Sequence, residues 1–194
     1  MTQTSPSPLA PGIVLIGPVA PGKSTLARLL AHELRLSYVS LDEITDRYYE
    51  ERGLSQAILA QLIQDQGFLA AYRKWWPSLA YVTERVLTEH PHSVVDLGAG
   101  HSHYEDPELF ARIQRALAPY GHVILVLPSP DLDRSVSTLR ERSVQQRGWD
   151  WNVDDYDFID HWVKDHCNHD LATITVYTEG KTPEETCTEI LARL

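Results

Sequence analysis

Gly17-Pro18-Val19-Ala20-Pro21-Gly22-Lys23-Ser24-Thr25 forms a complete G-x-x-x-x-G-K-S motif, and the rest of the expected architecture can be built around it. The apolar run at residues 13–16 predicts a buried strand before the motif, and the leucine spacing of residues 26–31 predicts a helix after it. A strand, a glycine-containing loop and a helix start are the setting of a phosphate-binding P-loop. A glycine-rich turn without a ligand is the alternative interpretation.

The residue types of this loop suit the phosphates of ATP. Lys23 supplies a positive charge for the outer phosphates, and Ser24 offers a hydroxyl to Mg²⁺. Pro18 and Pro21 have no N–H group, so at least one backbone donor is absent and the loop is stiffer than usual. The expected nucleotide-binding residues of the loop are Gly17, Pro18, Ala20, Pro21, Gly22, Lys23, Ser24 and Thr25.

Composition restricts the classes of protein to which this chain can belong. Its 194 residues suggest a single domain over residues 12–194, after a Ser/Thr/Pro-rich stretch at 1–11 that we expect to be a disordered tail. A net charge of −10 disfavours binding to nucleic acid or to an anionic membrane. The two cysteines, Cys167 and Cys187, form no disulfide framework, which favours a cytoplasmic location.

Strands and helices alternate along the chain. The expected strands are residues 13–16, 36–41, 93–97, 122–127 and 172–177, with helical segments between them. This alternation predicts an α/β fold with a parallel sheet of five strands, whose carboxyl ends form the binding crevice. Pro77 is expected to end one helix, and residues 79–89 to form another.

Two aspartates follow predicted strands at this edge of the sheet. Asp96 has the position of a Walker B carboxylate that holds Mg²⁺, together with Ser24. Asp42 could orient the hydroxyl that attacks the phosphate, or accept its proton. Helix N-capping or a turn at a strand end is the alternative role for each carboxylate.

Arginines supply candidates for binding anions. Arg73, between Tyr72 and Trp75, suits an acceptor molecule, although an exposed surface arginine is an equal alternative. The helix after the fourth strand has the place of a mobile lid, and its arginines could neutralise charge during transfer. Of these we selected Arg140 and Arg142, with Arg140 as a catalytic candidate.

Histidines follow the third strand and also gather near the fifth. His101 and His103 come directly after Gly98-Ala99-Gly100 and could contact the acceptor. His161, His166, Cys167 and His169 have the side chains of metal ligands, but their spacing matches no zinc motif.

With these residues placed, most of residues 12–194 resembles shikimate kinase and the wider group of P-loop small-molecule and nucleotide kinases. The resemblance implies a three-layer P-loop kinase fold, with helices on both faces of the sheet, acceptor-binding helices at about 42–90 and a lid at about 134–165. It places the acceptor-contacting aspartate at Asp42, whereas Ser40 replaces the family's magnesium-binding aspartate.

The same resemblance implies further binding residues. The family's acceptor-binding arginine corresponds to Arg73, and its glycine turn corresponds to Gly98, Ala99 and Gly100. The segment after the last strand resembles the one that flanks adenine, which implies nucleotide contacts for Lys181 and Thr182. The family's Arg-Pro-Leu-Leu lid signature is replaced by a longer segment rich in tryptophan and acidic residues.

The sequence therefore predicts a kinase that uses ATP and Mg²⁺ to phosphorylate a hydroxyl of a small polar metabolite or natural product, such as an antibiotic. Its partner would be this small-molecule acceptor. The protein itself would be a monomer or a homodimer. A nucleoside or nucleotide kinase, a nucleotide-binding regulatory ATPase and a toxin-type kinase acting on a large substrate are the alternatives.

Overall fold

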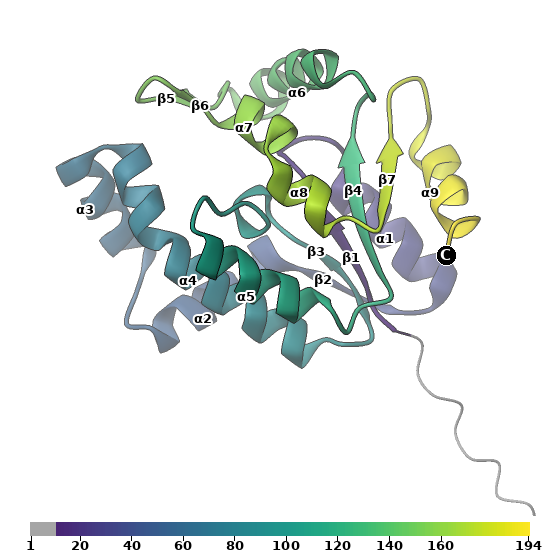
Figure 1. Cartoon of the computed structure of the whole chain (residues 1–194), viewed down its shortest axis with the longest axis horizontal. Helices are drawn as coiled ribbons and strands as arrows, with labels where there is room; N and C mark the ends of the chain where they lie inside the picture. Colours follow the sequence, from purple (N-terminus) through teal and green to yellow (C-terminus); the bar gives the residue numbers. More distant parts are fainter. Residues whose placement is uncertain (1–10) are drawn as a thin grey trace, which may run out of the picture.

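The computed structural model describes residues 11–194, and a five-stranded parallel sheet lies at its centre (Figure 1). The strand order is β2-β3-β1-β4-β7, and every neighbouring pair is parallel. This confirms the predicted sheet; the predicted tail at 1–11 lies outside the described residues except for Pro11. The strands are β1 (Ile13–Ile16), β2 (Ser37–Ser40), β3 (Ser93–Asp96), β4 (His122–Leu127) and β7 (Ile174–Tyr177).

Side chains alternate across the sheet and build a separate hydrophobic core on each face. In β1, Val14 and Ile16 point into one core, whereas Ile13 and Leu15 point into the other. Helices α1 (Lys23–Leu34) and α9 (Pro183–Leu191) cover the second of these faces (Figure 1). The fold therefore has the three layers that were predicted.

The other face is covered by more helices, and its core is the larger of the two. Helices α2, α4, α5, α6, α7 and α8 contribute buried side chains to it. Their bounds are α2 (Leu41–Glu51), α3 (Gln56–Gln66), α4 (Phe68–Glu89), α5 (Pro107–Leu117), α6 (Leu132–Arg147), α7 (Phe158–Lys164) and α8 (His166–Leu171). Within residues 11–194, no helix is both long and apolar enough to cross a membrane.

Helix α4 runs without interruption through Pro77, so the predicted helix break is wrong. Proline removes one backbone hydrogen bond from a helix interior, but packing on both sides compensates here. Trp75 and Trp76 before the proline and Leu79 after it are all buried in the larger core. Tertiary contacts thus override a strong local signal, and the helix extends over 22 residues.

The segment after α6 forms a short hairpin, β5 (Asn152–Val153) with β6 (Tyr156–Asp157), and then α7. Figure 1 shows α6 and this hairpin above the carboxyl ends of the strands. The hairpin contacts the start of α4, where Asp154 Oδ2 accepts a hydrogen bond from Leu69 N at 3.0 Å. It therefore supplies a cap for the start of α4, where Gly67 has no side chain to do so.

Candidate functional site: two adjoining pockets at the strand ends

The P-loop lies between β1 and α1, and its backbone conformation requires glycine. Gly17 has a φ of 128°, and a Cβ there would lie 2.8 Å from the carbonyl oxygen of Val126. Gly22 has a φ of 101° and is the N-cap residue of α1. Because glycine has no side chain, no side-chain hydrogen bond caps the start of this helix. The first N–H groups of α1 are therefore left for a ligand, and the positive end of the helix favours an anion.

A pocket of about 390 Å³ opens over this loop. Protein atoms do not fill the space, so a phosphate chain has room there. From the P-loop and the adjacent strand ends, the lining residues are Val19, Ala20, Pro21, Gly22, Lys23, Ser24, Thr25, Leu26, Asp42, Asp96, Leu97, Gly98 and Ala99. From the lid and the last βα connection they are Arg142, Gln146, Arg147, Thr178, Lys181, Pro183 and Thr186.

Lys23 is buried at the floor of this P-loop pocket. Its Nζ donates hydrogen bonds to the carbonyl oxygens of Gly17 at 3.0 Å and Pro18 at 2.6 Å. Burial lowers the pKa of Lys23, while the charges of Asp96 and Asp42 raise it. An ammonium group held by two neutral carbonyls is well placed to exchange them for phosphate oxygens.

Asp96 ends β3 beside this lysine, and it is buried. Burial raises the pKa of its carboxyl, whereas the charge of Lys23 and a hydrogen bond from Ser24 lower it. Carboxylate and hydroxyl oxygens are ligands that Mg²⁺ prefers, and a cation would relieve the burial of the carboxylate. Ser24 and Asp96 therefore fit a magnesium ion, whereas Ser40 is not among the residues lining the pocket.

Asp42 lies in the first turn of α2, against the loop that follows β3. A Cβ added to Gly98 would overlap Asp42 Oδ1, so only glycine at this position lets the carboxylate approach so closely. Asp42, Gly98 and Ala99 line both the P-loop pocket and a second pocket beside it. The two pockets thus adjoin at the Asp42 carboxylate.

The lid brings Arg142 and Arg147 to the P-loop pocket, but Arg140 does not line it. Arg140 forms an ion pair with Asp157 of β6. Residues two apart on a helix point about 200° apart, so Arg140 and Arg142 face different directions in this structure, and a phosphate contact from Arg140 stays a prediction. Arg147, another arginine of this helix, ends α6 and lines both pockets.

On the other side of the P-loop pocket, Lys181 lines the space but Thr182 does not. The Thr182 side chain accepts a hydrogen bond from Glu185 N at 3.1 Å, as half of a capping box at the start of α9. Its hydroxyl therefore has a structural role, and the nucleotide contact expected of Thr182 stays a prediction. Lys181 pairs with Glu189 at 2.5 Å.

The second pocket has a volume of about 330 Å³, and six of its lining side chains are those of Tyr, Phe or Trp. We name it the acceptor-side pocket. Besides the shared residues Val19, Asp42, Gly98, Ala99 and Arg147, it is lined by Tyr49, Gln56, Leu59, Ile63, Phe68, Tyr72, Trp75, Leu79, Gly100, His101, Trp151 and Trp162. Local sequence patterns predict little of this wall, because its rings come from α2, α4 and the lid segment with α7.

Arg73 and His103 do not line this pocket, and their predicted contacts with an acceptor stay predictions. Arg73 lies on the outer surface of α4 and donates hydrogen bonds to both oxygens of Glu105, at 3.1 and 2.9 Å. Its helix directs the neighbouring Tyr72 to the pocket instead. His103 is almost fully buried, 3.6 Å from Asp165, and is not among the lining residues.

His101 does line the acceptor-side pocket. Its Nδ1 lies 3.0 Å from Thr83 Oγ1, which already donates its proton to Leu79 O at 2.9 Å. Nδ1 is therefore the donor in the pair, and Nε2 is left as an acceptor. Burial lowers the pKa of His101 to about 4, so the ring is neutral at physiological pH.

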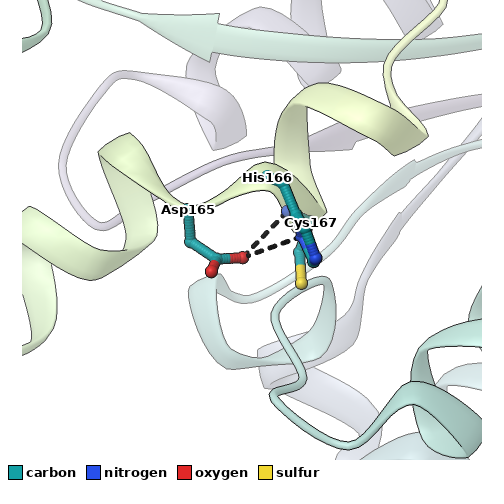
Figure 2. A group of neighbouring side chains, drawn as sticks. All are labelled: Asp165, His166 and Cys167. Carbon is teal, nitrogen blue, oxygen red and sulfur yellow. Dashed lines mark hydrogen bonds and ion pairs between the residues drawn. The ribbon is translucent and has the colours of Figure 1, made fainter.

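The structure places the histidines and the cysteine that precede β7. Within the part of the chain that the structure describes, the one group with metal-ligand side chains close together is Asp165, His166 and Cys167 (Figure 2). Asp165 caps α8 by accepting from Cys167 N at 2.8 Å. His169 contacts Val163 O, and His161 stacks on Tyr156, so neither joins the group.

No family model matches the chain, and no curated protein is significantly similar to it in sequence. Solved structures share its fold. Shikimate kinase from Acinetobacter baumannii in complex with shikimate is similar with a TM-score of 0.64 and 18% identity, over 95% of this chain and 92% of that one. Shikimate kinase from Aquifex aeolicus gives a TM-score of 0.58 and 23% identity, over 93% of this chain and 94% of that one.

The APS kinase of Mycobacterium tuberculosis, in complex with AMPPNP and APS, is also similar. Its TM-score is 0.54 at 16% identity, over 96% of this chain and 98% of that one. At these identities the likeness concerns the fold and leaves the substrates open. The chain therefore has the fold of the shikimate kinase-like P-loop kinases, as the sequence predicted.

Proposed function

We propose that this protein is an ATP-dependent phosphotransferase that phosphorylates a hydroxyl group of a small molecule. The observation that carries the proposal is the meeting of two pockets at one carboxylate, Asp42. One pocket is built on a P-loop, and the other is lined by residues of helices and of the lid. A donor of phosphate and an acceptor can thus be held side by side with the carboxylate between them.

The reaction follows from this arrangement. The acceptor oxygen bonds to the γ-phosphorus of ATP as the bond from that phosphorus to the bridging oxygen breaks, and ADP leaves. The proton of the acceptor hydroxyl passes to Asp42. Lys23, Arg142 and Arg147 stabilise the charge on the phosphate oxygens. Ser24 and Asp96 would hold a magnesium ion, which neutralises charge on the triphosphate when bound.

The acceptor-side pocket also bears on the regulatory ATPase alternative. A nucleotide switch that signals to a protein partner needs a docking surface and does not need a second pocket beside its nucleotide site. Here Trp151 and Trp162 of the Trp-rich segment line that pocket. This favours the kinase over the switch.

The first test is transfer of phosphate from [γ-³²P]ATP to a panel of small alcohols. Lys23→Ala removes the buried cation of the P-loop and should lower transfer at least about 10²-fold, the scale for loss of one charge-stabilising donor. Lys74→Ala, which removes an exposed lysine of α4, is the matched control and should leave the rate unchanged. Full activity in Lys23→Ala would contradict the proposal.

A further inference from the structure

The acceptor-side pocket differs from the P-loop pocket in the chemistry of its wall. Six of its lining side chains carry aromatic rings: Tyr49, Phe68, Tyr72, Trp75, Trp151 and Trp162. Leu59, Ile63 and Leu79 add aliphatic surface. Such a wall favours the flat face of an apolar ligand, because ring stacking and the removal of apolar surface from water both stabilise it.

Charge is confined to one end of this pocket. Among its lining residues, all within the described chain, the charged side chains are Asp42 and Arg147, and both also line the P-loop pocket. They therefore lie at the junction, where the phosphoryl group is transferred. The interior beyond them offers no charged group to an anionic acceptor.

The polar groups of the interior are neutral. Gln56 contributes an amide, and His101 is held as a neutral imidazole with Nε2 free to accept. Burial raises the pKa of Tyr49 to about 12 and raises that of Tyr72 further, so both phenols keep their protons. A carboxylate, sulfate or phosphate on the acceptor would thus be buried without a counter-charge, which is costly.

Arg73 of α4 is the arginine that the resemblance implied for binding an acceptor carboxylate, but it is paired with a protein carboxylate instead. Arg73 forms a two-bond ion pair with Glu105, and Tyr156 of the lid hairpin donates to the same carboxylate at 2.9 Å. The guanidinium therefore has its partner on the outer surface. The resemblance to shikimate kinase had implied the opposite, a contact between this arginine and the acceptor.

We propose that the acceptor is an uncharged aromatic alcohol, whose ring lies between the aromatic walls while its hydroxyl reaches Asp42 at the junction. The phosphoryl transfer to this alcohol rests on the proposed kinase function. The preference for an aromatic ring depends only on the residues that line the pocket. The volume of about 330 Å³ falls within the range of small-molecule sites, roughly 300–1,000 Å³. A polyol or a charged metabolite does not suit this wall.

Binding can be measured without ATP, by titration calorimetry with 2-(2-naphthyl)ethanol as the probe and shikimate as the anionic comparison. The matched variants are Ile63→Glu, which places a carboxylate in the pocket, and Ile58→Glu, which makes the same change on an exposed position of α3 that does not line it. No residue of α3 is fully buried, so neither change disrupts the core.

The naphthyl alcohol should bind saturably to the wild type and to Ile58→Glu, and at least about tenfold more weakly to Ile63→Glu. The proposal is overturned if shikimate binds more tightly, if the naphthyl alcohol does not bind, or if both variants lose affinity equally. A [γ-³²P]ATP assay then separates the two claims. Binding with no phosphorylation of any alcohol would refute the kinase function alone, whereas preferred phosphorylation of shikimate would refute the aromatic acceptor alone.

Discussion

At the scale of single residues, the proposed transfer step depends on Asp42. This residue occupies the junction of the two pockets, and Gly98 leaves it the space to do so. The sequence could place this carboxylate at a strand end, since the pattern of strand, aspartate and helix is local. The sequence could not show that Gly98, 56 positions further along the chain, has to be glycine for the Asp42 carboxylate to fit.

Asp42→Asn should lower kcat by about 10²–10⁴-fold, because the amide cannot take the proton from the acceptor hydroxyl. The KM for ATP should change little, since the P-loop is intact. Steady-state kinetics with varied ATP measures both. Glu43→Gln is the matched control, because Glu43 is in the same turn but pairs with Arg28 at 3.3 Å. Equal losses in the two variants would exclude a role for Asp42 in proton transfer.

His101 makes a second prediction, about stability and pH. Its pKa is about 4 in the folded protein, below the 6.5 of an unfolded chain, so the unfolded state binds the proton first as pH falls. The free energy of unfolding should therefore decrease from pH 6.5 towards pH 4, by up to about 1.4 kcal/mol per pH unit from this residue. His103, whose pKa is also lowered by burial, adds in the same direction.

Urea denaturation at pH 7.0, 6.0 and 5.0 measures this dependence. His101→Gln should have a shallower pH dependence than the wild type over this range. His32→Gln replaces an exposed imidazole of α1 and should keep the wild-type slope. An unchanged slope in His101→Gln would show that the ring is not held in its neutral form.

At the scale of elements, the sequence predicted most boundaries well where local signals act alone. Strand β4 spans residues 122–127 as expected, and prolines follow its end. Helix α4 was predicted as two pieces, since the packing of Trp75 and Leu79 cannot be read from the neighbours of Pro77. Local patterns thus fail where long-range burial decides.

The contact between the lid hairpin and α4 is another feature that sequence patterns do not reveal. Asp154 accepts from Leu69 N across 85 positions of the chain. Asp154→Ala should raise the rate of amide hydrogen exchange at Leu69 and in β5–β6, because the loss of a helix cap costs about 1 kcal/mol. Hydrogen exchange followed by mass spectrometry measures it.

Asp155→Ala is the matched control for that experiment. Both residues have a positive φ, 54° and 58°, so alanine introduces the same backbone strain at each. Asp154→Ala should therefore show the larger increase in exchange. If the two variants exchange alike, the hairpin is not held through this hydrogen bond.

At the scale of the whole molecule, the parallel sheet explains why distant motifs meet. All five strands are parallel, so their carboxyl ends lie at one edge of the sheet with α6 beside it (Figure 1). The P-loop, Asp42, Asp96 and residues of α6 line one pocket there. That convergence was predictable from the alternation of strands and helices. The placement of Arg73 and His103 was not, because it depends on Glu105 and on the packing near α8 rather than on any local pattern.

The central claim is that the P-loop pocket binds the triphosphate of ATP through Lys23, and titration calorimetry with Mg·ATP tests it most directly. The wild type should bind one equivalent, and Lys23→Ala should bind at least about tenfold more weakly, as expected when a charged hydrogen-bond donor is lost. Lys74→Ala should match the wild type. Absence of binding by the wild type, or equal affinity in Lys23→Ala, would contradict the account.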